Sequence, residues 1–159
     1  MNLDAPNIYG EVWYTAKTTG GTAIDASIYP GYVLCADVDE EVGDGFAKNY
    51  TRPETANLNQ RKCIVLDVPS AVNDTISTGV RRGGKVKVAW VLDGPPPLGF
   101  FVNGTTNDIT ATSLLGVTNG SFALWHKASI DGTCCARSGA AYATDAEGRI
   151  TKGTFNGLA

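Results

Sequence analysis

The sequence predicts an all-β protein: a compact antiparallel β-sandwich or barrel, jelly-roll or tulip-like, with an extended N-terminal arm. Of its 159 residues, 43% are hydrophobic and only 18% are charged. That composition supplies one sizeable core and lacks the Lys and Glu of helical proteins. Asn-Gly, Asp-Gly and Glu-Gly pairs recur every 9 to 16 residues after residue 92. Such pairs supply the positive φ of tight hairpin turns.

The first segment, residues 1–28, is expected to form the arm, and residues 29–159 a single β domain. Pro6 and the Gly20-Gly21 pair interrupt any regular pattern. The segment nevertheless contains Trp and Tyr, and solvated linkers are depleted in aromatic residues. We therefore expect the arm to pack on a partner through its apolar residues, which are Ile8, Tyr9, Val12, Trp13 and Tyr14.

The clearest strand pattern lies at residues 84–92. Alternation there gives one face Val86, Val88, Trp90 and Leu92, and the other Lys85, Lys87 and Ala89. Residues 32–38 and 62–68 are continuously apolar, as is typical of strands covered on both faces. Further strands are predicted at 121–126, 140–144 and 149–152. Helical signal is thin, and residues 108–115 would form one turn at most.

Charge and chain ends exclude several partners. A net charge of −3 provides no overall positive field for nucleic acid or an anionic bilayer. The N-terminus has neither the basic start nor the apolar run of a secretory signal, and no apolar stretch is long enough to span a membrane. We expect a protein that is made in a cytosol and binds neither nucleic acid nor membrane.

Groups that could perform chemistry are sparse. The four cysteines, Cys35, Cys63, Cys134 and Cys135, show no C-x-x-C spacing, and the first two are expected to be buried as small hydrophobes. The single histidine, His126, is expected to be structural, on the same side of its strand as Phe122 and Leu124. No nucleophile motif accompanies it. The sequence therefore predicts no catalytic residue and no cofactor.

The acidic segment at residues 37–44 could in principle provide a carboxylate pair or hard oxygen ligands. The calcium loop of an EF-hand needs Gly at its sixth position and Glu at its twelfth, which here are Val42 and Lys48. Mutual repulsion among the carboxylates favours a solvated loop instead. No metal site is therefore predicted.

Two segments could contact another protein. The basic cluster at residues 81–87 is expected to be a turn entering a strand with two lysines facing water, and an acidic protein patch would be its best-matched ligand. The three prolines at 95–97 must leave the sheet as a stiff excursion. This excursion either re-enters the core or forms a preorganised apolar lip. The lip residues would be Pro95, Pro96, Pro97, Leu98, Phe100 and Phe101.

The turn-and-strand rhythm of residues 107–124 and 140–150, with the shorter pieces 29–34 and 83–88, resembles the small β-rich decoration (cement) proteins of tailed-bacteriophage heads. This resemblance implies a structural virion protein on the capsid exterior that stabilises contacts between major capsid protein subunits. It also agrees with a homo-oligomer, a trimer first and a dimer second, because closed symmetry lets one small interface act several times. The arm and the apolar lip would make the contacts.

Two other functions stay open. One is a carbohydrate-binding or fibre-associated β-sandwich module, in which Trp13, Trp90 or Trp125 would stack on sugar rings. The other, ranked third, is a hydrolase centred on His126.

Overall fold

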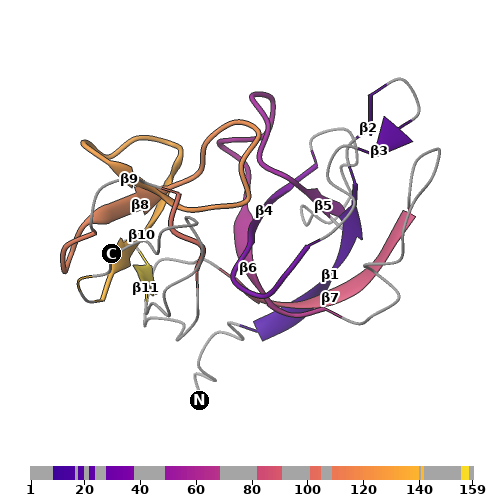
Figure 1. The fold of residues 1–159 in the computed structure, drawn as a ribbon, viewed down its shortest axis with the longest axis horizontal. Coiled ribbons are helices and arrows are strands. Elements are labelled where there is room, and N and C mark those ends of the chain that lie inside the picture. The colour runs from indigo at the N-terminus through magenta and orange to yellow at the C-terminus, as the bar shows by residue number, and fades with distance from the viewer. Residues whose placement is uncertain are drawn as a thin grey trace, which may run out of the picture.

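The longest strand, β7 (Arg82–Trp90), closes a five-stranded barrel with order β1-β5-β4-β6-β7 (Figure 1). The computed structural model describes residues 9–16, 18–19, 22–23, 28–37, 49–68, 82–90, 101–104, 109–139, 141 and 155–157. The other barrel strands are β1 (Tyr9–Thr15), β4 (Val33–Ala36), β5 (Asn49–Thr51) and β6 (Lys62–Asp67). All regular structure within the described residues is β, so the predicted fold class is confirmed, and the barrel is the form observed.

A second, four-stranded sheet with order β11-β10-β8-β9 lies beside the barrel (Figure 1). Its strands are β8 (Leu114–Gly116), β9 (Trp125–Lys127), β10 (Cys134–Ser138) and β11 (Phe155–Gly157). The short strands β2 (Thr18–Thr19) and β3 (Thr22–Ala23) pair with each other. Nearly all pairings are antiparallel, as expected, but β1 and β5 run parallel, with Trp13 opposite Asn49.

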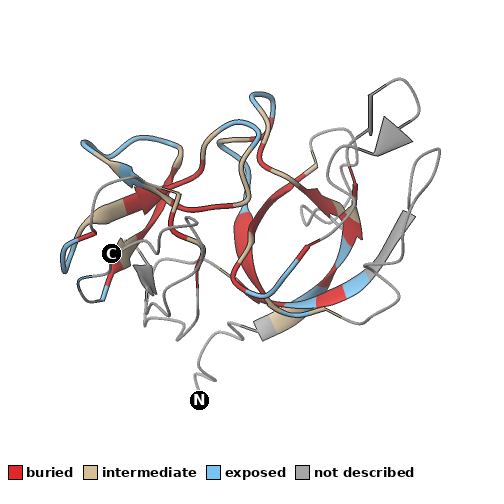
Figure 2. Ribbon diagram, viewed as in Figure 1, coloured by how far each residue is buried: buried red, intermediate tan, exposed pale blue. Residues whose placement is uncertain are grey.

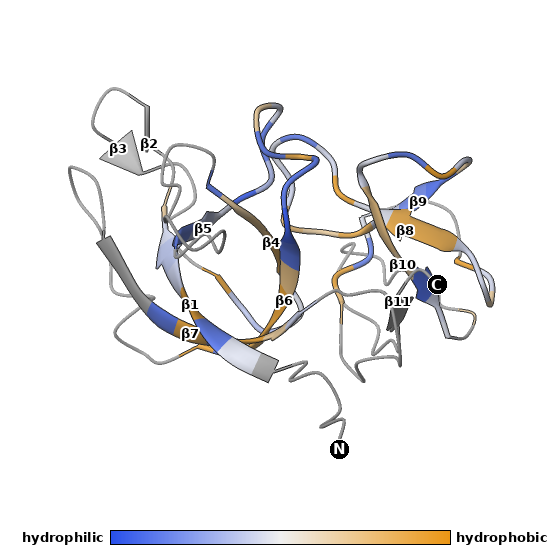
Figure 3. Ribbon diagram, turned by 180° about the vertical axis from the view of Figure 1, so that it is seen from behind, coloured by the Kyte–Doolittle hydropathy of each residue, from blue (hydrophilic) through white to orange (hydrophobic). Residues whose placement is uncertain are grey.

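Strand β7 shows the alternation that the sequence predicts. Val86 and Val88 are fully buried, whereas Lys85 and Lys87 are exposed. Figure 3 shows this alternation as hydrophilic and hydrophobic bands along the strand. One residue departs from the pattern, since Ala89 is buried although it was expected on the wet face.

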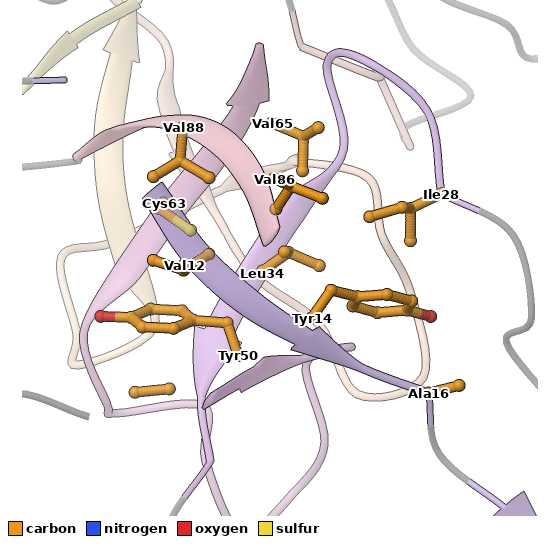
Figure 4. Packing of buried hydrophobic residues seen from close by; sticks show 11 residues of the cluster. Val12, Tyr14, Ala16, Ile28, Leu34, Tyr50, Cys63, Val65, Val86 and Val88 are labelled. Carbon is orange, nitrogen blue, oxygen red and sulfur yellow. The ribbon is translucent and has the colours of Figure 1, made fainter. Parts of the chain in front are cut away.

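The domain boundary at residue 28 is wrong for residues 9–16. Strand β1 pairs with β7 from Tyr9 opposite Ala89 to Thr15 opposite Arg82, so this part of the expected arm is a wall of the barrel. Val12 and Tyr14 point into the barrel interior (Figure 4). The physical reason is a period-two pattern, because Val12 and Tyr14 alternate with Glu11 and Trp13 and so place one apolar face inward.

Strands β4 and β6 form a wall shared by two hydrophobic clusters, which confirms the predicted cover on both of their faces. The barrel cluster takes Leu34, Ala36, Cys63 and Val65 from them, together with residues of β1, β5 and β7 (Figure 4). The second cluster takes Val33, Cys35 and Ile64 from the opposite faces. It adds side chains from the second sheet and its flanking segments, which are Phe101, Ile109, Leu115, Val117, Leu124, Cys135 and Ala136. Figure 2 shows the shared wall as mostly buried.

Several predicted elements differ from the structure. Of the strand expected at 121–126, only Trp125 and His126 belong to β9, and Leu124 forms an isolated bridge with Asn103. Residues 108–115, considered for a helical turn, contain the start of β8 instead. The strands expected at 140–144 and 149–152 lie outside the described residues, except for Ala141, which is in no strand.

Candidate functional site

The predicted contact residues of the N-terminal segment are divided between core and surface. Val12 and Tyr14 are buried, so their prediction as partner contacts is wrong. Trp13, between them, points outward and is 44% exposed. Tyr9 belongs to β1, and Ile8 lies outside the described residues. Among the residues of this group whose side chains are described, Trp13 is the one that remains available to a partner.

The predicted apolar lip is described only at its end. Phe101 is fully buried in the second cluster, so its prediction as a contact is wrong, and the chain there re-enters the core. The backbone N–H of Val102 donates to the carbonyl of Gly31 at 3.0 Å, which fixes this re-entry against the barrel. The remaining lip residues, Pro95, Pro96, Pro97, Leu98 and Phe100, lie outside the described residues.

The outer face of β1 and β7 gathers one aromatic and several charged side chains. Register places Trp13 opposite Lys85 and Glu11 opposite Lys87, and all four residues are exposed. The Lys85 ammonium lies 5.4 Å from the centre of the Trp13 ring, within the range of a cation–π interaction. Both lysines face water, as the sequence predicts. Lys87 also has exposed Asp67 of β6 opposite it in register, so carboxylates lie on both sides of it.

A second exposed aromatic, Tyr29, lies on a tight turn. Tyr29, Pro30, Gly31 and Tyr32 form this turn, in which the N–H of Tyr32 donates to the Tyr29 carbonyl at 3.1 Å. Gly31 has a φ of 93°, which favours glycine. The Gly31 N–H donates to the Val65 carbonyl at 2.8 Å, which anchors the turn to β6.

The rings around this turn form a short stack. Tyr29, which is 53% exposed, meets Tyr32 edge to face with centroids 5.6 Å apart. Tyr32 in turn stacks on Phe122 at 4.8 Å. Burial, with a smaller contribution from the neighbouring Tyr29, raises the pKa of the Tyr32 hydroxyl. The stack holds Tyr29 in place while leaving it accessible.

The third exposed apolar residue, Ile130, is at the tip of the loop between β9 and β10 and is 65% exposed. Asp131 fixes the tip by accepting hydrogen bonds from the Thr133 N–H at 2.7 Å and the Thr133 hydroxyl at 2.6 Å. These two bonds lower the pKa of the Asp131 carboxyl. The Cys134 thiol donates to the Ser129 carbonyl at 3.3 Å.

A buried lysine ties this loop to the barrel. Lys62, at the start of β6, donates from Nζ to the Gly132 carbonyl at 3.2 Å and to the Gln60 carbonyl at 3.0 Å. Gly132 also packs so closely on Asn59 that a Cβ there would collide with the amide. The loop that carries Ile130 is therefore held from several sides, which no sequence signal indicated.

The remaining tryptophans are half-buried and structural. Trp90 meets Tyr50 edge to face at 5.5 Å, and the Arg61 guanidinium lies 5.7 Å from its ring. The indole N–H of Trp125 donates to the Ser121 hydroxyl at 3.0 Å. Their rings have less surface to offer a sugar than Trp13 has.

The residue types that most often take part in catalysis or metal binding are few, and the structure places them as follows. His126 is exposed on β9, whereas Leu124 is buried, so the expected packing of His126 beside Leu124 is wrong. All four cysteines are free thiols and buried, as predicted for Cys35 and Cys63. Within the described residues, no three His, Cys, Asp or Glu side chains gather to hold a metal ion. In the same part of the chain, no helix has the length and apolarity to cross a membrane.

Comparison with protein-family models, with curated proteins and with solved structures finds no match to this chain.

Proposed function

We propose that this chain is a non-enzymatic structural protein of a virion, which binds the outer surface of a phage head. There it would stabilise contacts between subunits of the major capsid protein. The style of its sequence, which resembles that of decoration proteins, supports this proposal. The β scaffold, which carries exposed apolar side chains, also supports the proposal.

The observation that carries the proposal is the placement of Trp13, Tyr29 and Ile130. These are the large hydrophobic residues exposed in the described part of the chain, and each lies in or next to backbone that is held by hydrogen bonds. An apolar group that is already held in position loses little conformational freedom when a partner covers it, so more of its burial contributes to affinity. Three such groups on one rigid scaffold suit a protein whose task is contact.

Several copies of the same contact would strengthen overall binding to the capsid. We propose a homotrimer, with a dimer as second choice, because a closed ring of copies engages a symmetric lattice several times at once. Light scattering of the purified protein tests this point. A mass of three chains is expected, and a monomer at the concentrations that coat heads would contradict it.

The main experiment measures occupancy on empty phage heads that lack the protein. Deleting residues 1–20 would remove β1 with its buried Val12 and Tyr14 and would unfold the barrel, so single substitutions are the sharper tools. The triple change Trp13→Ala, Tyr29→Ala and Ile130→Ser should keep the fold and lower occupancy at least about tenfold. That loss corresponds to about 1.4 kcal/mol of contact free energy.

His126→Ala is the matched control. His126 is exposed on β9 of the second sheet and is none of the three residues proposed to make contact. It should coat heads like the unchanged protein. Undiminished coating by the triple variant would remove these residues from the mechanism. Absence of the chain from mature particles, as determined by mass spectrometry, would overturn the proposal itself.

A second candidate function, a carbohydrate-binding or fibre-associated module, is favoured by one observation. Trp13 presents an accessible indole on the outside of a sheet, and such rings stack on sugars. A glycan array tests this candidate: hits that disappear with Trp13→Ala would support it, and an array without hits would exclude it.

A further inference from the structure

We infer that Asn119 is a deamidation site, at which the side-chain amide is hydrolysed to a carboxylate, and that a contact with residues 53–57 suppresses the reaction in the folded chain. The inference goes beyond the proposed function and does not depend on it. Asn119 and Gly120 are the central residues of a β-turn, in which the N–H of Ser121 donates to the Thr118 carbonyl at 3.2 Å.

An asparagine followed by glycine is prone to this reaction, because a glycine has no Cβ to hinder the close approach of its backbone nitrogen. The nitrogen of Gly120 loses its proton to a hydroxide ion and attacks Cγ of Asn119. A bond between this nitrogen and Cγ forms, the C–N bond of the side-chain amide breaks, and the amide nitrogen takes a proton from water and leaves as ammonia. Water then opens the five-membered succinimide at either carbonyl, which yields aspartate or isoaspartate.

The Asn119-Gly120 pair is open to the reactants. Both residues are exposed, and nothing lies within 4 Å of the place where a Cβ on Gly120 would be. Gly120 has a φ of 74°, which glycine adopts without strain. By contrast Asn103, which precedes Gly104, is only 1% exposed. Of these two Asn-Gly pairs, Asn119 is therefore the one that hydroxide and water reach.

The nitrogen that must attack is held elsewhere. The Gly120 N–H donates to the carbonyl of the buried Pro53 at 2.8 Å. In the succinimide this nitrogen is planar, and Cγ occupies the position that the proton held, so the N–H bond must first turn from Pro53 toward Cγ. Turning leaves the Pro53 carbonyl without this donor, which is costly for a group that is screened from water. The reaction therefore requires the contact to open.

The side chain that must be attacked is held by the same segment. Oδ1 of Asn119 accepts a hydrogen bond from the N–H of Thr55 at 2.9 Å. This bond polarises the amide, but water donates to the exposed oxygen in the same way once the contact opens. What the bond adds in the folded chain is a fixed orientation of the amide. Together with the Gly120 bond, it raises the free energy needed for opening.

The segment that holds both groups is itself braced. The N–H of Asn57 donates to the Glu54 carbonyl at 2.9 Å, and Oδ1 of Asn57 accepts from the Glu54 N–H at 2.7 Å. Asn57 is buried, so these bonds are shielded from water. Residues 54–57 thus form a fixed turn, with Thr55 as its second residue. A fixed turn keeps its partners on Asn119 and Gly120 in place.

The first test compares the full-length protein with a synthetic peptide of residues 115–123, which lacks the segment 53–57. Both are incubated in the same mildly alkaline buffer, and digestion with mass spectrometry follows the conversion of the amide to a carboxylate. Asn119 should convert at least about tenfold more slowly in the protein, the factor that corresponds to about 1.4 kcal/mol. Equal rates would overturn the inference, and so would a peptide that does not convert.

Hydrogen exchange at the Gly120 amide makes the comparison quantitative. Exchange of this proton requires the same opening of the contact with Pro53, so its slowing relative to the peptide should match the slowing of deamidation within about threefold. Slow exchange at Gly120 combined with deamidation as fast as in the peptide would overturn the inference.

Thr55→Pro removes the N–H that holds Asn119, and it does so at a turn position where proline is favoured. The rate at Asn119 should rise about threefold or more, the effect of losing one ordinary hydrogen bond on the open population. Thr55→Ala is the matched control, because it keeps the N–H, and it should leave the rate within about twofold. Faster exchange at Gly120 in Thr55→Pro without faster deamidation would overturn the inference.

Asn103 in the same digests separates local opening from general loosening. The Gly104 N–H donates to the Leu124 carbonyl at 2.8 Å, a bond in which the segment 53–57 takes no part. Thr55→Pro should therefore accelerate conversion at Asn119 and leave Asn103 unchanged, and equal acceleration at both would overturn the role of the contact. If Thr55→Pro does not change exchange at Gly120, the comparison with the peptide decides by itself.

Discussion

Gly10 lies directly beneath the indole of Trp90, so closely that a Cβ on Gly10 would be 2.7 Å from the Trp90 Nε1 atom. Both residues belong to barrel strands, since Gly10 in β1 pairs with Val88 and Trp90 ends β7. The missing side chain at position 10 thus provides the space that the indole occupies. This contact closes one end of the barrel seam between β1 and β7.

Gly10→Ala should lower the free energy of unfolding by about 1–3 kcal/mol, because added volume in a packed site forces neighbouring groups to move. Urea denaturation measures the change. Combining it with Trp90→Phe, which shortens the ring, should recover part of the loss relative to Trp90→Phe alone. Equal stability of Gly10→Ala and the unchanged protein would show that the indole has room to shift.

Lys62→Met should loosen the loop that carries Ile130. The substitution removes both hydrogen bonds from Nζ and leaves the Gly132 carbonyl without that donor, at a cost of about 1–3 kcal/mol. Hydrogen exchange at the Thr133 and Cys134 amides should become faster. Lys127→Met is the comparison, since within the described residues its Nζ donates to the Thr118 hydroxyl at 3.4 Å and to no carbonyl of this loop, and it should change the exchange of those amides far less.

The buried thiols should make the protein sensitive to alkali. Burial, partly offset by the nearby Lys62 charge, raises the pKa of the Cys35 thiol from 9.0 to about 12. Burial, again partly offset by the Lys62 charge, raises the pKa of the Cys135 thiol to about 12. Between pH 9 and pH 12 the unfolded chain loses these protons while the folded chain keeps them, so stability falls with rising pH across that window and is unaffected below it.

Urea denaturation from pH 8 to pH 11 checks this expectation. Cys35→Ala with Cys135→Ala starts from lower stability, because both side chains fill the second cluster, but its decline with pH should be shallower. A decline as steep as that of the unchanged protein would assign the alkaline sensitivity to other groups. The pKa of Tyr50 is also raised, chiefly by burial.

Ile130→Ser and Leu115→Ala should have opposite consequences. Ile130 is exposed, so its substitution should change the free energy of unfolding by no more than about 0.5 kcal/mol and act on head occupancy. Leu115 is fully buried in the second cluster, and its truncation should cost about 2–5 kcal/mol. Thermal unfolding distinguishes them, and a large loss of stability with Ile130→Ser would place that side chain in the fold instead of at a contact.

The parts of the fold that could be predicted are those with a local signal. Alternation identified β7, and continuous apolarity identified β4 and β6 together with their cover on both faces. The same period of two was present at Glu11, Val12, Trp13 and Tyr14, but Pro6 and the Gly20-Gly21 pair on either side favoured an arm.

Other parts depend on long-range contacts that no local pattern encodes. Strand β10 begins with Cys134 and Cys135, which are both buried, so it shows no alternation. The parallel pairing of β1 with β5 joins segments more than 30 residues apart. Of the candidate contacts, exposed Trp13 was predicted, whereas Tyr29 and Ile130 gave no signal, because exposure depends on which neighbours the fold brings to them.

The wall formed by β4 and β6 has a consequence for strand alignment. Leu34 faces the barrel cluster and Cys35 faces the second one, so a slip of one position would send every side chain of these strands into the wrong interior. In a sheet with one wet face, such a slip exposes apolar groups to water. Here it would disrupt the packing of two hydrophobic clusters at once, so both clusters would lose stabilising contacts.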